Sequence, residues 1–472
     1  MVTFAKAIEQ ISKANPFVGE LYHCDEPLSE YAKNRITHCD FDPVHKERQK
    51  SYLEAIKNKI NKLFPNEDLR VNYDEGMIVD TSDHHFILNF PTTLGAHMVT
   101  RFDTLLKRKE YGDYFVLDCG NVSLGNPLTH RGVEFAGKHL NLFPKDDKNK
   151  LISRYPLYKL DFLEWMRKSE NKYSDDEIKF LEKLQKVIDS IDFSTCERFS
   201  DQIVKINYHL WQEMFAPEIR DDVRRCVTLE HDEILINYLA DFILKNQDNH
   251  IFKALFNPEF RIEVLKEFNG VYGAWNYSGE NTGTHFFWGY NGDGKEYRLE
   301  IVGDKLINKE GKVADIELSP ESISKALKDG ILIPAIFTKF ALVAFYLGAK
   351  TMGGPGQTEY TEKLKQAWIR VLEKFGEDKE LELIKKVNVL NYNCVDLGFY
   401  REGEGKIQKE WALDMIRSQR LTREYLEKIG QVSFKYFLYP IIQICYYRMT
   451  PAAERQEVEY TDKDLFQGFD WV

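Results

Sequence analysis

The chain has 472 residues, of which 43% are hydrophobic and 13% aromatic, so it can bury a large core and is not disordered. Its formal net charge of -11 argues against nucleic acid as a partner, because phosphate backbones bind basic surfaces. The seven cysteines are scattered and form no C-x-x-C motif, which argues against a disulfide framework and indicates a reducing, cytoplasmic location.

The first half of the chain predicts a small, mainly parallel sheet flanked by helices. Helical spacing runs from about residue 44 to 64, and a β-like run then ends at Thr81. A helix is expected from about 91 to 107, and a second β-like run ends at Cys119. Strand–helix–strand units of this kind build parallel sheets. The fold class predicted for the whole chain is therefore α+β or α/β.

The second half is predicted to be mostly helical, with an inserted β-hairpin. Residues 270–304 are rich in Gly, Asn and aromatics, and Asn291–Gly294 has the residues of a tight turn, so a hairpin is expected near 284–303. From Ser319 almost to Tyr447 the pattern is helical. Three parts are expected: 1–195, 196–449, and an acidic tail, 450–472, that serves as a docking strap.

No membrane association is expected. Residues 331–349 are nearly long enough to span a bilayer, but Lys339 lies in the middle of the segment and Pro334 near its start. We interpret it as one buried central helix. The segment 434–447 predicts a core helix kinked at Pro440. The N-terminus lacks the apolar stretch of a signal peptide.

The strongest candidate for chemistry is the triplet Asp83-His84-His85, directly after the first predicted strand. Ligands bind outside the carboxyl ends of parallel strands. Carboxylate and imidazole groups bind Zn, Mn or Fe and also transfer protons, so these residues are candidate catalytic groups and, with His97, candidate metal ligands. The alternative is a capped loop in which backbone carbonyls satisfy the histidines.

The triplet resembles the motif of the DHH phosphoesterases, in which an Asp-His-His string follows a strand and helps to bind Mn. Residues 37–42 superficially resemble the first motif of that family. The resemblance covers about residues 36–105, and Pro43-Val44-His45 stands where the family has its Gly-Asp-x-x-Gly-Ser continuation. The chain as a whole is assigned to no family.

The loop after the second strand, 120–132, is the second candidate. Arg131 is suited to clamp a carboxylate or phosphate, Asn121 and Asn126 to bind a polar substrate, and His130 to transfer a proton. If the two strands are neighbours, this loop and the triplet line one crevice. The alternative is a turn cluster whose Asn and Gly residues serve the backbone.

Two further segments are candidates for substrate binding. Trp275, His285 and Trp288 form a Gly–aromatic segment that suits a stacking wall, although an ordinary core hairpin explains them as well. Gly353–Gly356 is followed by Gln357 and allows close approach of a ligand, but it lacks the P-loop pattern. Cys119 and the run His231-Asp232-Glu233 are weaker candidates.

The leading hypothesis is an enzyme acting on a polar, anionic small molecule, with metal-dependent hydrolysis as one form. One alternative is a metal-free transferase or ligase that uses the loop 353–356. The other is a non-catalytic binding or scaffold protein, in which the tail with Phe466, Phe469 and Trp471 docks into its own chain or a second subunit of a homo-oligomer.

Overall fold

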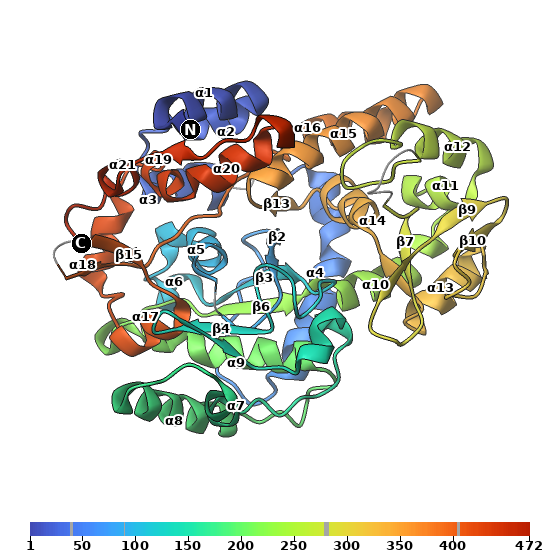
Figure 1. The fold of residues 1–472 in the computed structure, drawn as a ribbon. Coiled ribbons are helices and arrows are strands. Elements are labelled where there is room, and N and C mark those ends of the chain that lie inside the picture. The colour runs from blue at the N-terminus through green and yellow to red at the C-terminus, as the bar shows by residue number, and fades with distance from the viewer. Residues whose placement is uncertain (38–40, 89, 278–282, 404–405) are drawn as a thin grey trace.

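The computed structural model describes residues 1–37, 41–88, 90–277, 283–403 and 406–472, without the side chains of residues 81–83. The architecture is mixed α+β, which confirms the predicted fold class. Helices predominate, and a small parallel sheet lies among them (Figure 1).

In the described part of the chain the central sheet has four parallel strands in the order β13-β2-β3-β6 (Figure 1). Their bounds are Ile78–His84 for β2, Tyr114–Cys119 for β3, Cys226–Glu230 for β6 and Lys350–Met352 for β13. The predicted parallel pairing of β2 and β3 is confirmed. β6 and β13 are absent from the sequence-based prediction, and they bring segments of the second half into the same sheet.

Alternate residues of the strands enter two separate hydrophobic cores, as the two faces of a sheet require. Ile78 and Val116 belong to the first core, and Val79 and Leu117 to the second. Helices that pack into the first core include α1 (Phe4–Ala14), α2 (Pro16–Leu21), α5 (Pro91–Val99) and α9 (Phe199–Glu213). Helices of the second core include α4 (Pro43–Leu63) and α10 (His231–Asp241).

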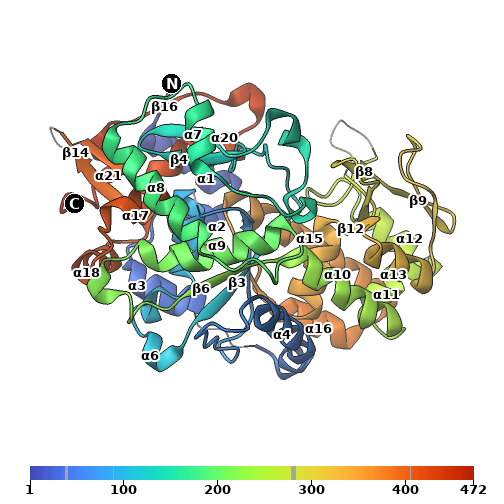
Figure 2. The same ribbon diagram turned by 90° about the horizontal axis from the view of Figure 1, so that it is seen from below.

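The other helices surround this centre (Figure 2). Their bounds are α3 (Leu28–Tyr31), α6 (Arg108–Tyr111), α7 (Phe162–Lys168), α8 (Asp175–Asp189), α11 (His250–Phe256), α12 (Pro258–Glu267), α13 (Pro320–Lys328), α14 (Ile336–Phe340), α15 (Pro355–Phe375), α16 (Asp378–Lys386), α17 (Ala412–Ser418), α18 (Arg423–Gly430), α19 (Lys435–Leu438), α20 (Ile442–Met449) and α21 (Asp462–Phe466).

Small antiparallel sheets lie outside the centre. One is β12 (Leu332–Pro334), β7 (Phe287–Tyr290) and β8 (Glu296–Arg298); another is β11 (Ile316–Glu317), β10 (Lys305–Ile307) and β9 (Glu300–Val302). The pairs are β4 (Gly132–Phe135) with β5 (Lys138–Asn141) and β14 (Phe399–Glu402) with β15 (Lys406–Lys409). The predicted hairpin is present as β7 and β8, joined at Asn291–Gly294.

The apolar segment 331–349 is not one helix. Its first residues form β12, which pairs with β7, and the chain then continues as α14 and a π-helix, Ala341–Tyr346. The hairpin offers β12 a strand partner, and this tertiary pairing overrides the helical pattern. Among the described residues no helix is long and apolar enough to cross a membrane.

The N-terminal strand pairs with a strand of the C-terminal tail. β1 (Val2–Thr3) pairs in parallel with β16 (Val458–Glu459), and α1 packs against α20 (Figure 1). Phe469 of the tail is fully buried against Phe399, with ring centroids 4.2 Å apart. The predicted strap therefore lies on its own chain. A 3-10 turn containing Pro440 separates α19 from α20, where the sequence predicts a kink.

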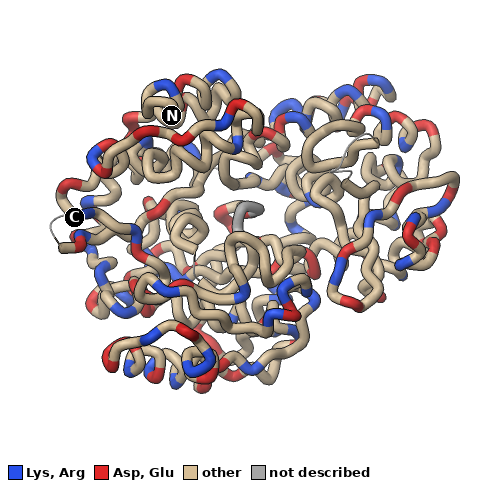
Figure 3. The backbone as a smooth tube through the Cα atoms, viewed as in Figure 1, with Lys and Arg blue, Asp and Glu red and all other residues tan. Residues whose placement is uncertain are grey.

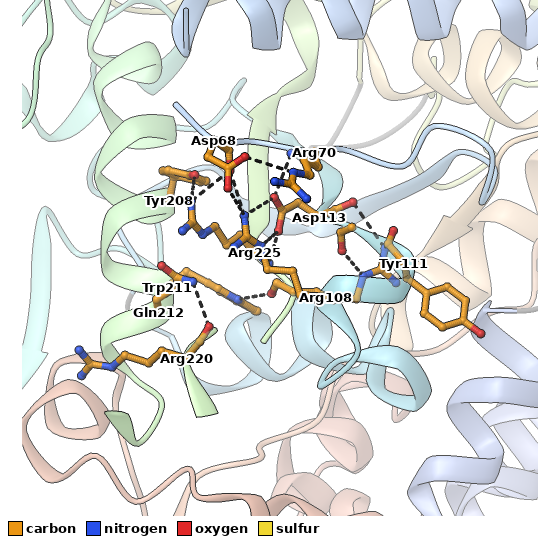
Figure 4. A network of polar contacts seen from close by, with 12 residues as sticks. Asp68, Arg70, Arg108, Tyr111, Asp113, Tyr208, Trp211, Gln212, Arg220 and Arg225 are labelled. Atoms are coloured by element: carbon orange, nitrogen blue, oxygen red, sulfur yellow. Dashed lines mark hydrogen bonds and ion pairs between the residues drawn. The ribbon is translucent and has the colours of Figure 1, made fainter. Parts of the chain in front are cut away.

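An arginine–aspartate network fixes the amino ends of β3 and β6 (Figure 4). The carboxylate of Asp113, which is fully buried, accepts hydrogen bonds from Arg108 Nε at 2.8 Å and from the backbone N–H groups of Arg70 and Arg225. These bonds set the register of β3 and β6 at the amino ends of the two strands.

Candidate active site at the carboxyl edge of the sheet

His84 and the loop after β3 meet, as the predicted neighbouring strands imply. In the β2–β3 register His84 lies opposite Cys119, and His84 Nδ1 is 2.8 Å from Asn126 Oδ1. Burial lowers the pKa of His84, so this imidazole is neutral at pH 7. The side chain of Asp83 lies outside the described residues.

His85 and His97 lie on either side of one buried carboxylate, that of Asp118. His85 Nδ1 is 3.4 Å from one Asp118 oxygen, and His97 Nε2 is 3.4 Å from the other. Nε2 of His85 is 3.0 Å from the Ser200 carbonyl. Burial opposes a charge on His85, but Asp118 and the Ser200 carbonyl outweigh it and raise its pKa. All three side chains are buried, so this group braces β2, α5 and β3.

No metal centre is assembled from the residues that the structure describes. Among them no group of three or more His, Cys, Asp or Glu side chains is arranged to hold a metal ion. His84 points to Asn126, whereas His85 and His97 contact Asp118. The described histidines of the predicted set, His84, His85 and His97, are thus divided between two environments, and metal ligation, which also involves Asp83, stays a prediction.

In the loop 120–132, Arg131 donates a hydrogen bond from Nη1 to the Phe143 carbonyl at 2.9 Å. His130 is exposed, and both residues have positive φ, 45° and 64°. Asn126 binds the loop itself through Ser123 and Thr129. The structure of the loop itself thus explains why Asn126, His130 and Arg131 are present. Asn121 instead forms a hydrogen bond with Glu296, in the charged cluster described below.

The predicted stacking wall is part of the second core. Trp275 is 1% exposed and donates from Nε1 to the Leu265 carbonyl. His285 accepts a hydrogen bond at Nδ1 from Ile301 N–H, and burial lowers its pKa to about 4. Trp288 is half-buried in β7. Gln357, on the first turn of α15, packs over Gly353, whose added Cβ would lie 2.0 Å from Gln357 Oε1.

A cluster of charged side chains that the sequence analysis did not assemble lies where β3 and β6 end; we call it the carboxyl-edge cluster. It consists of Cys119, Asn121, Glu230, Asp232, Glu296 and Lys339. Figure 3 shows basic and acidic residues interspersed along the outer helices. In the carboxyl-edge cluster, by contrast, the charges act on one another: the charge of Asp232 acts on Glu230 and Glu296, and the charge of Lys339 acts on both as well.

The ends of the strands position Glu230 and Cys119. Asp118 pairs with Glu230 in the β3–β6 register, so Cys119 and Glu230 both end their strands at this edge. The Glu230 carboxylate caps α10 by accepting the N–H groups of Asp232 at 2.7 Å and Glu233 at 3.2 Å. It packs on Gly120, where an added Cβ would lie 2.5 Å from Glu230 Oε1.

Lys339 supplies the positive charge of the cluster. It lies on α14, is 7% exposed, and forms an ion pair with Asp232, which is 2% exposed. Its Nζ is also 3.7 Å from Cys119 Sγ. Burial opposes the charge of Lys339, but Asp232, Cys119 and Glu230 outweigh it and hold the pKa above its usual value. Lys339 is therefore a fixed cation.

Two carboxyl groups in the cluster have a pKa near neutrality. Burial, and then the charge of Asp232, raises the pKa of Glu230 to about 7. Burial raises the pKa of Glu296 to about 7 as well, against the opposing effects of Lys339 and a hydrogen bond from Asn121. Burial raises the pKa of the Cys119 thiol to about 11, so Cys119 is protonated and is a poor nucleophile at pH 7. The cluster suits proton transfer better than covalent catalysis.

One sequence signal was available. Glu230 and the run His231-Asp232-Glu233 follow the apolar run Cys226–Leu229, just as Asp83 and His84 lie at the end of β2. Lys339 is a lone charge in the apolar segment 331–349. We interpreted it only as evidence against a membrane span, although a lone buried charge also indicates a functional site.

No protein-family model matches the chain, and no curated protein shows significant similarity to it.

Proposed function

We propose that the protein is an enzyme that acts on a small, polar, anionic molecule by general acid–base catalysis at the carboxyl-edge cluster. Glu230 and Glu296 transfer protons, and Lys339 stabilises negative charge on the substrate or on the transition state. The observation that carries the proposal is a pair of carboxyls with a pKa of about 7, the buried Glu230 and the half-buried Glu296, in the field of one buried ammonium group. A carboxyl with that pKa exchanges protons at neutral pH, which an ordinary Glu does not.

The preference for an anion rests on the neighbouring cations. Arg154 is close enough to Glu230 and Asp232 for their charges to act on its pKa, which burial and Arg198 together hold below the usual value. A second cation that acts on the same carboxylates as Lys339 favours a substrate that brings negative charge.

The test is an activity screen with nitrophenyl phosphate, nitrophenyl acetate and nitrophenyl glycosides of simple sugars, followed by the variants Glu230→Gln and Glu296→Gln. Each variant is expected to lower the rate by about 10²–10⁴-fold, the usual contribution of a general acid or base, without lowering the melting temperature. Glu424→Gln, on the surface of α18, is the matched control and should keep full activity. Full activity in both cluster variants would refute the proposal.

Metal-dependent hydrolysis remains a prediction that depends on Asp83. It is tested by the metal content of the purified protein beside the double variant Asp83→Ala/His84→Ala. Near-stoichiometric metal that is lost in the double variant would support a metal site at β2. No metal in either protein would leave proton transfer by the carboxyl-edge cluster as the proposed chemistry.

The transferase or ligase alternative has one structural observation in its favour. Gly353 and Gly354 join β13 directly to the N-terminus of α15, a helix of 21 residues, at the carboxyl side of the sheet. Arg448 packs against the first turn, since a Cβ on Gly356 would lie 2.7 Å from its guanidinium carbon. A phosphate group suits such a helix terminus beside an arginine. Nucleotide binding that is lost in Arg448→Met would favour this alternative.

A further inference from the structure

A cavity of about 710 Å³ lies at the amino end of the edge strand β13, beside Lys350, the first residue of this strand. Its wall is formed by the π-helix Ala32–Thr37, the start of α4, the turn before β13 and the segment 386–392. The carboxyl-edge cluster lies where β3 and β6 end, so the two places are separated by the length of the parallel sheet. The volume is in the range of small-molecule sites.

The wall of this cavity is more basic than the protein as a whole. Among the described residues Arg35, Lys350 and Lys386 line it together with one carboxylate, that of Asp42, in a chain of net charge -11. Lys386 pairs with Asp42 at 3.1 Å, and Arg35 pairs with Glu20 at 3.2 Å and with Glu26 at 3.1 Å. The Lys386 side chain is 63% exposed and that of Arg35 38%, and such exposed pairs contribute little, so ligand oxygens can replace the carboxylates.

Parts of the wall are rigid and uncharged. His45, Tyr31 and Tyr392 are almost completely buried. Gly348 has φ +62°, and a Cβ there would lie 2.3 Å from the His45 ring, so the turn before β13 accepts only glycine. The side chains of Phe17 and Phe41 add half-buried aromatic surface. Apolar surface of this kind beside cations suits a ligand with an organic part and an anionic group.

We propose that this cavity is a second ligand site, which binds a phosphorylated small molecule through Lys350 and Lys386 and holds the organic part against the aromatic wall. Lys350 is positioned for this role because its Nζ donates to the Ile36 carbonyl at 2.9 Å, which fixes the ammonium group at the wall. A ligand there contacts the start of α4 and β13 and does not reach the carboxyl-edge cluster.

The experiment is isothermal titration calorimetry of the full chain at low ionic strength with AMP, glucose 6-phosphate and inorganic phosphate, beside adenosine and glucose. We expect AMP or glucose 6-phosphate to bind in a 1:1 ratio, and the uncharged counterpart at least tenfold more weakly. The double variant Lys350→Met/Lys386→Met should weaken binding by at least tenfold. The control pair Lys13→Met/Lys363→Met, exposed on α1 and α15, removes the same charge and should change the affinity less than twofold.

If the double variant does not fold, Lys386→Glu replaces it, because that side chain is largely exposed. Three results would overturn the proposal: no organic phosphate binds below about 1 mM, the control pair weakens binding as much as the cavity variants, or inorganic phosphate binds as tightly as the organic phosphates. Binding that is lost in Lys339→Met or Arg448→Met but kept in the cavity variants would also overturn it, because the ligand would then lie at the carboxyl edge of the sheet.

Discussion

The ion pair between Lys339 and Asp232 is buried. Removing one of the two charges is therefore expected to destabilise the protein more than removing both. Lys339→Met leaves a buried carboxylate without its partner, and we expect the free energy of unfolding to fall by about 3–5 kcal/mol in urea denaturation. Adding Asp232→Asn should restore part of that loss, because the uncompensated charge is removed. Equal stability of the single and double variants would contradict a coupled pair.

Glu230 links stability to pH. Its pKa is raised from 4.5 to about 7 in the folded protein, so its neutral form is favoured by folding. The stabilisation is complete below pH 4.5 and is lost as the pH rises through about 7, at roughly 1.4 kcal/mol per pKa unit. We expect the stability of the wild type to fall relative to Glu230→Gln over this interval in urea unfolding at fixed pH values. A stability difference between the two proteins that does not change with pH would show that the pKa of Glu230 in the folded protein is ordinary.

At the scale of elements, the close contact of α5 with the segment around Val395 depends on Gly95. A Cβ at this position would lie 1.7 Å from the Val395 carbonyl oxygen. Gly95→Ala should therefore lower the free energy of unfolding by about 1–3 kcal/mol or more through overpacking. Gly430→Ala, at the end of α18, meets only a phenyl edge at 3.1 Å and should stay within about 1 kcal/mol of the wild type.

Elements with strong local signals were predictable from the sequence. The strand that ends at Cys119, the turn Asn291–Gly294 and the helix Pro43–Leu63 follow from spacing and turn chemistry. β12 was not predictable, because its partner β7 lies far away in the chain and the local pattern is helical. The candidate site shares this difficulty. Glu230, Glu296 and Lys339 become neighbours only when β6, the hairpin and α14 pack together.

At the scale of the whole molecule, the tail closes the fold. Phe469 lies between Phe399 and Phe437 in the first core, so Phe469→Ala should cost about 3–5 kcal/mol of unfolding free energy. Tyr460→Ala, at a residue that is 42% exposed, is the matched control and should have little effect on thermal unfolding. A small effect of both variants would mean that the tail is only loosely held.

Deleting residues 455–472 tests whether the tail is only a strap on its own chain or also joins subunits. Because the tail packs on its own chain, we expect the deletion to lower the melting temperature and to leave the number of subunits on gel filtration unchanged. Dissociation of a larger assembly would instead show that the tail also joins subunits, as the scaffold hypothesis predicts.

The order of strands in the central sheet also bears on synthesis by the ribosome. β2 lies between β3 and β13, and β13 leaves the ribosome only after residue 352 has been translated. For most of translation one side of β2 is therefore an open strand edge, of the kind that pairs with other nascent chains. Chains stalled before residue 350 should remain bound to chaperones, and release should follow once β13 has emerged.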